Sequence, residues 1–489
     1  MALLRKQGPL AESYPAAVVL VLLALTPYLV LTTALTPLQP LLSKDLGMGM
    51  RGLQLTSGMA NAAYAFGAVL GVQLTSRLKV RRVLLTAAVV YVVASVLAAL
   101  APTAGCFVAG RVVQGLTTGM LLIAAVPPLV IGWPAEKMPI TAVVMNLGIF
   151  GAVALGPVIG GVAAGGGWWH PLFWVMTAIG AGTVAFALLT YKDQDPQASD
   201  APVDIVALVL CAGGCAAAFF GVSELMGRHL LSTIVLVPVG AGIAMLIAVL
   251  AYEYRHPDPL IPVERLATTL PVAGILVAMV GGAGSVALVE LTQAATKLRG
   301  VPRAHAGALF WPEVGGALMA AVLFGALFRT RYTPVLAGAG LLLLTAAAVV
   351  LTGAAHGGDT LVLVGSGAVG LGVGASVSPA LFVAGFSLPS PLLPRVFAMV
   401  ELLRGVAAFL VAPVLAHVAK TTSGGTRGAT WVVFGIAAAG LAAVVCIYLA
   451  GGQRLQDPRI EAWSEGSDTA KDSHPLGAAF RARAAVRTR

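Results

Sequence analysis

Long apolar runs separated by short polar or basic loops form the pattern of this chain. A membrane-spanning helix needs about 20 largely apolar residues. Fourteen runs meet this requirement, and they lie near residues 15–40, 53–75, 83–102, 104–132, 139–166, 169–191, 204–226, 230–252, 270–296, 305–328, 332–353, 360–387, 393–419 and 428–450. Because lipid offers no partner for open backbone groups, each run should form a helix. The pattern predicts an all-α polytopic membrane protein with 14 transmembrane helices.

The composition agrees with membrane embedding. Of the 489 residues, 58% are hydrophobic and 10% are charged, whereas a soluble globular chain carries about 25% charged residues. The net charge of +10 arises from basic residues in the short loops between apolar runs. We therefore expect these charges to report membrane topology and expect no nucleic-acid partner.

The positions of Lys and Arg predict the orientation. With the N-terminus inside, the inner loops and tails hold 20 of these residues and the outer loops hold 8. Basic residues favour the cytoplasmic side of a membrane, where they face anionic lipids. We predict a multi-pass protein of the bacterial cytoplasmic (inner) membrane, with both termini in the cytoplasm and an uncleaved first span.

The polar segments between apolar runs predict the domain organisation. The segment 192-KDQDPQASDAPVD-204 is acidic and contains proline, so it is typical of a linker. Residues 71–85 and 325–340 share a glycine, then basic residues, then an apolar run, which suggests two related halves of a transporter. The expected parts are an N-terminal six-helix bundle at 1–191, a linker with inserted spans 7 and 8 and an amphipathic cytoplasmic loop at 192–269, a C-terminal six-helix bundle at 270–450, and a disordered cytoplasmic tail at 451–489.

One span is rich in glycine around a proline, in the segment 146-NLGIFGAVALGPVIGGVAAGG-166. Small residues let helix backbones approach closely inside a bilayer, and proline is tolerated there when a neighbour satisfies the freed carbonyl. We therefore expect a kinked, tightly packed span that suits a hinge or sliding contact, with plain helix packing as the alternative. The residues of this hinge are Gly151, Gly156, Pro157, Gly160 and Gly161.

Two motifs carry a family resemblance. The pattern G-P-x-x-G-G at 156–161 resembles the fifth-span antiporter motif of drug–proton antiporters in the major facilitator superfamily, and 110-GRVVQGLTTG-119 resembles their R-x-x-Q-G motif in span 4. Further resemblances to the family are Tyr64, the tryptophan-rich entry to span 6 at 167-GWWHPLFW-174, and Arg404 with Gly405 in span 13. The stretches 256-HPDPLIPVERL-266 and 293-QAATKLRGVPRAHAGALFWP-312 resemble its fourteen-span subgroup. The resemblance implies the major facilitator fold, with two six-helix bundles and two inserted spans.

The loop after the second span departs from the family pattern G-x-L-a-D-R-x-G-R-R. Ser76 stands where the family has the aspartate that helps lock the outward-open state, and Lys79 stands at its glycine. The cytoplasmic gate that the resemblance implies is therefore Ser76, Arg77, Arg81 and Arg82. The subgroup's span-1 aspartate is also missing from 30-VLTTALTPLQP-40, so the first six predicted spans hold no carboxylate for proton coupling.

Charged residues inside spans are costly and therefore mark functional positions. Arg111 lies in span 4, where it either organises proton traffic or binds backbone carbonyls at a kink. Glu313 follows a proline in span 10, and desolvation favours its protonated form, which suits a coupling switch; pairing with a basic residue nearer the surface is the alternative. Glu401 and Arg404 are three residues apart on one helix face, either as a self-neutralising ion pair or as part of an inner gate or polar cavity. The residues expected to take part in proton coupling are Glu313, Arg111, Glu401 and Arg404.

A substrate cavity is expected from polar and aromatic residues of several spans. Glu290 lies near the outer interface, where a surface position is the alternative, and Gln293 follows it by one turn. For each aromatic residue, packing or interface anchoring is the alternative. The cavity residues are Tyr28, Tyr64, Gln114, Asn146, Trp174, Glu290, Gln293 and Trp311.

Enzyme, metal and cofactor chemistry have no sequence support. There is no G-x-x-x-x-G-K-[ST] phosphate loop, and the four cysteines lack the spacing of a metal site. We expect no cofactor and no metal, and we expect a monomer whose partners are protons, anionic lipids and a small-molecule substrate.

Three functions remain open. The first is a secondary active exporter of small amphipathic or cationic molecules, such as antibiotics, driven by proton antiport with alternating access. The second is an exporter of the same fold for a lipid or endogenous metabolite, with weak or no proton coupling. The third is a non-transporting membrane sensor or scaffold, against which the cavity motifs argue.

Overall fold

A computed structural model describes residues 8–190, 202–466 and 468–478 of the chain. It confirms an all-helical membrane architecture, because 14 helices in this part of the chain are long and apolar enough to cross a bilayer. The linker expected at 192–204 falls mostly outside the described residues. No strand occurs in the described ranges, and the one isolated bridge pairs Thr268 with Pro475.

The helices follow the expected runs, with edges that differ by several residues. The first six spans are α1 (Tyr14–Leu46), α2 (Met50–Arg77), α3 (Val80–Ala99), α4 (Ala104–Ile131), the fifth span built of α5 (Met138–Asn146), η3 (Leu147–Gly151) and α6 (Ala152–Gly166), and α7 (Trp169–Thr190). The inserted pair is α8 (Ile205–Ser223) and α9 (Thr233–Arg255). The last six are α11 (Thr269–Leu298), the tenth span built of α12 (Arg303–Ala308) and α13 (Trp311–Leu327), α14 (Thr333–Leu351), α15 (Gly358–Gly385), α16 (Leu393–Thr421) and α17 (Gly425–Ala450).

Short helices complete the chain at the loops. They are η2 (Ala135–Lys137), η4 (Glu224–Met226), α10 (Val263–Leu266), η5 (Ser390–Leu392) and α18 (Ile460–Ser464).

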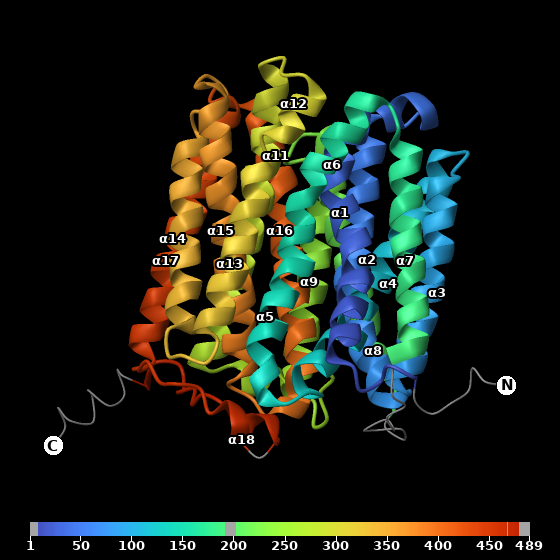
Figure 1. Ribbon diagram of the computed structural model, residues 1–489. Coiled ribbons are helices and arrows are strands. Elements are labelled where there is room, and N and C mark those ends of the chain that lie inside the picture. The colour runs from blue at the N-terminus through green and yellow to red at the C-terminus, as the bar shows by residue number, and fades with distance from the viewer. Residues whose placement is uncertain (1–7, 191–201, 467, 479–489) are drawn as a thin grey trace.

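Two groups of helices stand side by side in Figure 1. We call α1 to α7 the N-terminal half and α11 to α17 the C-terminal half. The inserted helices pack on each other, and α8 also contacts α2 and α16, so the insert lies against both halves. The proximal end of the bundle is where α1 begins and α17 ends, and the distal end is where α12 lies (Figure 1).

The fifth span carries a proline inside its helix. Pro157 has no N–H, so the carbonyl of Val153 one turn earlier lacks its helical partner. Thr33 of α1 supplies that partner, since its hydroxyl donates to the Val153 carbonyl at 2.7 Å. The wide turn of η3 comes just before this point, and such π-turns mark irregular, often functional, helix segments. The neighbouring helix thus satisfies the break, as a span in lipid requires.

The tail differs from the disordered segment expected at 451–489. Residues 451–466 and 468–478 run along the proximal end of the C-terminal half and include α18 (Figure 1). Trp463 is 0% exposed, and Ile460 and Ala470 are also buried. The polar composition suggested disorder, but three apolar side chains find a surface that only the folded bundle provides. We call these residues the tail strap.

Candidate functional site: a cavity between the two halves

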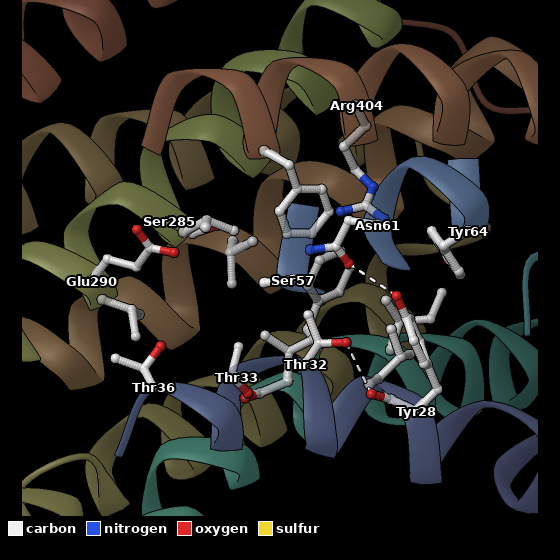
Figure 2. A pocket seen from close by; sticks show the side chains of 18 of the residues that line it. Tyr28, Thr32, Thr33, Thr36, Ser57, Asn61, Tyr64, Ser285, Glu290 and Arg404 are labelled. Atoms are coloured by element: carbon white, nitrogen blue, oxygen red, sulfur yellow. Dashed lines mark hydrogen bonds between the residues drawn. The ribbon is translucent and has the colours of Figure 1, made fainter. Parts of the chain in front are cut away.

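A cavity of about 70 Å³ lies between the two halves, and Figure 2 shows the side chains around it. It occupies the middle and distal part of the bundle, because its lining runs from Tyr28 to Thr36 along α1 and from Ser285 to Gln293 along α11. Pockets for drug-sized ligands span about 300–1,000 Å³. An organic substrate of that size would need the helices to move apart.

The N-terminal wall is polar but uncharged. Helix α1 contributes Tyr28 and a row of threonines, and α2 contributes Ser57, Asn61 and Tyr64. The Tyr28 hydroxyl donates to Asn61 Oδ1 at 3.1 Å, and the Thr32 hydroxyl donates to the Tyr28 carbonyl at 2.9 Å (Figure 2). The two tyrosine rings stack with centroids 5.7 Å apart. This wall offers hydrogen bonds and aromatic faces to a bound molecule.

The C-terminal wall carries the charge. Glu290 and Gln293 of α11, Glu313 of α13 and Arg404 of α16 line it. Glu313 is 3% exposed, and its Oε2 atom has no hydrogen-bond partner among the described residues. The pairing of Glu313 with a basic residue, which was the alternative to a coupling role, is absent from the described ion pairs. Glu290 lines the cavity and does not lie on the outer surface, which was the alternative for it.

A three-residue cluster lies at the proximal end of the cavity, where Tyr64 and Arg404 line it. Arg404 Nη2 lies 2.5 Å from Glu401 Oε2, and Arg404 Nε donates to Glu401 Oε1 at 3.2 Å. The predicted intrahelical pair is therefore confirmed. Tyr64 of α2 donates its hydroxyl to Glu401 Oε2 at 3.1 Å. This bond joins the two halves, a link that the spacing on α16 alone could not reveal.

Arg111 lies behind the N-terminal wall and is not among the cavity-lining residues. Its guanidinium carbon is 4.9 Å from the centroid of the Tyr28 ring, and its Nη1 donates to Gln114 Oε1 at 2.7 Å. Gln114 Nε2 in turn donates to Ser95 Oγ at 2.7 Å. The prediction that Gln114 lines the cavity is wrong, because its side-chain amide is hydrogen-bonded to Arg111 and Ser95 instead. The cation–π contact connects Arg111 to the cavity only through Tyr28.

Three more predicted cavity residues lie elsewhere. Asn146 is 0% exposed, and its Nδ2 donates to the Gly374 carbonyl of α15 at 3.0 Å, so it links the two halves. Trp174 is 43% exposed and Trp311 is 55% exposed, and neither lines the cavity. Their helices are almost entirely apolar, so the sequence did not show which face a tryptophan would occupy.

The four glycines predicted to form the hinge of the fifth span differ in what they contact. A Cβ added at Gly160 would lie 2.7 Å from the Ala34 carbonyl of α1, and one at Gly156 would lie 1.9 Å from Thr33 Oγ1. A Cβ at Gly161 would lie 2.7 Å from the Cα atom of Gly307 in α12. Gly156 and Gly160 thus seat α1, and Gly161 forms a backbone contact between the halves at the distal end. Gly151 has ordinary space around it.

The expected gate residues lie at the proximal end of α2 and the start of α3. The Ser76 hydroxyl donates to the Gln73 carbonyl of its own helix at 3.0 Å. Arg81 is 9% exposed, while Arg82 is exposed and Arg77 is half-buried. A serine turned back on its helix cannot replace the charge of an aspartate.

Several cavity residues escaped the sequence reasoning. They are Thr32, Thr33, Thr36, Ser57, Asn61, Ser285 and Phe409. A signal was present in part, because Tyr28, Thr32 and Thr36 are spaced by four residues and so share one face of α1. No group of three or more His, Cys, Asp or Glu side chains in the described residues is placed to hold a metal.

Comparisons with known proteins agree on the fold. The family model of the Major Facilitator Superfamily matches residues 21–412. The uncharacterized MFS-type transporter YubD of Bacillus subtilis is 28% identical over 54% of this chain and 52% of its own length. The multidrug resistance protein B homolog of Mycobacterium tuberculosis is 28% identical over 62% of this chain and 57% of its own. The chain thus spans little more than half the length of these relatives.

A solved structure has the same architecture. The human organic anion transporter MFSD10 (TETRAN) matches with a TM-score of 0.63, covering 88% of this chain and 99% of its own. The sequence identity is 16%, so the likeness concerns the fold alone.

Proposed function

Because this chain belongs to the Major Facilitator Superfamily, we propose that it is a secondary active exporter of small amphipathic or cationic molecules, driven by proton antiport with alternating access. The observation that carries the proposal is Glu313, a buried carboxyl group that lines the cavity between the halves and has an unpaired oxygen there. A carboxyl group in lipid surroundings marks an ion or proton pathway.

Proton coupling would use the charged wall. Glu313 can exchange a proton with the cavity because no described basic side chain neutralises it. Glu401 is held by Arg404 and Tyr64, so it serves better as a closing contact than as a proton carrier. Arg111 would act indirectly, by fixing the Tyr28 ring.

The substrate class follows from the contrast of the walls. An amphipathic cation would place its apolar body against Tyr28, Phe150 and Phe409 and its charge near Glu290 or Glu313. The name of the multidrug resistance relative supports a drug as cargo. Export of a lipid or endogenous metabolite without tight coupling is the second candidate, favoured by the lack of acidic residues deep in the N-terminal half, where Asp45 and Glu136 lie at helix ends.

The orientation is part of the proposal. We place the proximal end in the cytoplasm, facing anionic lipid headgroups, on the strength of the basic loops. Reporter fusions ending at Thr330 and at Gly300 should report the cytoplasm and the outside, respectively. The opposite pattern would reverse the orientation.

The test of function is transport by the purified full chain in proteoliposomes, preceded by a drug-susceptibility panel in a pump-deficient host. The panel identifies a substrate, and its transport is then measured with and without an imposed pH gradient. Stimulation by the gradient is expected. Transport without stimulation would favour the uncoupled exporter, and binding without transport would favour the sensor.

A further inference from the structure

The tail strap is anchored to the C-terminal half by a buried tryptophan. Trp463 is 0% exposed, and its Nε1 atom donates to the Leu388 carbonyl at 2.8 Å. Its ring meets Phe386 edge to face at 5.0 Å, and Phe386 continues into a column with Phe328 and Phe382. A large aromatic side chain with its polar atom satisfied is a strong anchor.

Backbone hydrogen bonds fix the rest of the strap. The Lys471 amide donates to the Phe386 carbonyl at 2.9 Å, and the Thr269 amide donates to the His474 carbonyl at 3.0 Å. The amide of Leu270 donates to Ser473 Oγ at 3.0 Å. These bonds tie the strap to the start of α11 and to the turn after α15.

Charged contacts align the strap without adding much stability. Arg329 Nη2 lies 2.5 Å from Glu461 Oε1, and the Arg331 amide donates to Asp457 Oδ1 at 2.8 Å. Both residues of the ion pair are exposed, and exposed pairs contribute about 0–1 kcal/mol. They set the position of α18 on the loop between α13 and α14.

From this base the strap reaches the N-terminal half. Helix α18 lies beside η2, the short turn that starts the fifth span. Ala135 of η2 is 7% exposed and belongs to the same hydrophobic cluster as Ile460 and Trp463. The adjoining α5 contacts α13 of the other half, where a Cβ added at Gly325 would lie 2.4 Å from Val143. The strap therefore crosses the line along which the halves would separate at the proximal end.

We propose that the tail strap is a conformational latch that favours the proximally closed state, and that α18 must leave η2 before the proximal side opens. Because the anchor sits on the C-terminal half, the strap stays attached there while the contact with η2 breaks. The latch acts on an opening step of the cycle proposed above. The test of the latch measures distances within the protein, so its result does not depend on whether the protein transports a substrate.

The experiment measures the distance between spin labels across the proximal end of the full chain in lipid nanodiscs. Labels at Glu136→Cys and Val335→Cys report on η2 and on the exposed first turn of α14, in a background where Cys106 and Cys446 are serine. The comparison is between the parent, Trp463→Ala, and a chain that ends at Gly452. Trp431→Ala is the matched control, because Trp431 is 45% exposed on α17.

We expect both strap variants to raise the ratio of long to short distances by about five- to thirtyfold, the effect of losing one or two kcal/mol of closing contact. The Trp431→Ala distances should equal those of the parent. If Trp463→Ala elutes as an aggregate, Trp463→Phe, which keeps the ring contact but loses the hydrogen bond, should show a smaller rise. A monodisperse chain ending at Gly452 with the parent's distances would overturn the latch.

Discussion

The two halves of the cavity use different chemistry. The N-terminal wall presents hydroxyl and amide groups, and the buried Arg111 behind it is covered by the Tyr28 ring. The C-terminal wall presents two glutamates and an arginine. A molecule between the walls therefore meets hydrogen-bonding and aromatic groups on one side and titratable groups on the other. Under the proposed function, recognition and proton exchange are separated between halves that move relative to each other.

Removing the acid from the C-terminal wall should produce the largest effect. Glu313→Gln keeps size and polarity but cannot exchange a proton, so we expect at least a tenfold loss of the stimulation by a pH gradient, with substrate binding retained. The measurement is transport in proteoliposomes with and without the gradient. Thr36→Val on the opposite wall is the control and should keep its stimulation. A Glu313→Gln protein that responds like the parent would remove Glu313 from the coupling scheme.

Crowding the N-terminal half should come next. A Cβ at Gly160 would stand 2.7 Å from the Ala34 carbonyl, while one at Gly151 has its nearest neighbour at 3.6 Å. We expect Gly160→Ala to insert into the membrane but to lower efflux several-fold, because α1 and the fifth span must shift apart. Gly151→Ala should stay near the parent. Equal efflux by the two variants would show that close helix approach does not limit transport.

Cutting the hydroxyl link between the halves should have a moderate effect. Tyr64→Phe removes a hydrogen bond to the charged Glu401, a class of bond that contributes about 1.5–3 kcal/mol. Tyr28→Phe removes a bond to the neutral Asn61 within one half, of a class that contributes about 0.5–1.5 kcal/mol. Thermal unfolding in detergent should rank Tyr64→Phe as the less stable variant. The reverse order would mean that the link between the halves carries little energy.

The smallest effect should come from pH at the tail strap of the C-terminal half. Burial lowers the pKa of Lys471 to about 8 from 10.5. The docked strap then binds fewer protons than the released one between these two values, so docking should strengthen as pH rises from about 8 to 10.5 and stay constant below about 8. A spin label at Glu465→Cys should lose mobility over that window. Lys471→Met should abolish this dependence, and an unchanged profile would assign it to another group.

The helices and one ion pair could be predicted because they depend on local sequence. Fourteen apolar runs became fourteen spans, since each needs only its own length and composition. Glu401 and Arg404 meet because they are three residues apart on α16. Pairing within a helix follows from its geometry, whatever the rest of the fold does.

The sequence-based predictions that were wrong concern features that depend on tertiary packing. Trp174 and Trp311 lie on helices that are almost entirely apolar, so the sequence gives little sign of which way each side chain faces. Gln114 lies one turn from Arg111. Whether its side chain bonds to Arg111 or faces the cavity depends on how α4 packs against α3. The tail strap is polar on average, and its few apolar side chains fit a surface made by distant segments.

The hydrogen bond from Thr33 to the Val153 carbonyl has a mechanical consequence. If α1 slid along the fifth span by a turn, that carbonyl would lose the hydroxyl donor that replaces its missing helical partner, and an unpaired buried polar group costs about 1–3 kcal/mol. The bond therefore fixes the register of α1 against the fifth span and resists small sliding motions between the two helices. Since Thr33 also lines the cavity, a molecule bound in the cavity can contact the residue that fixes the register of these two helices.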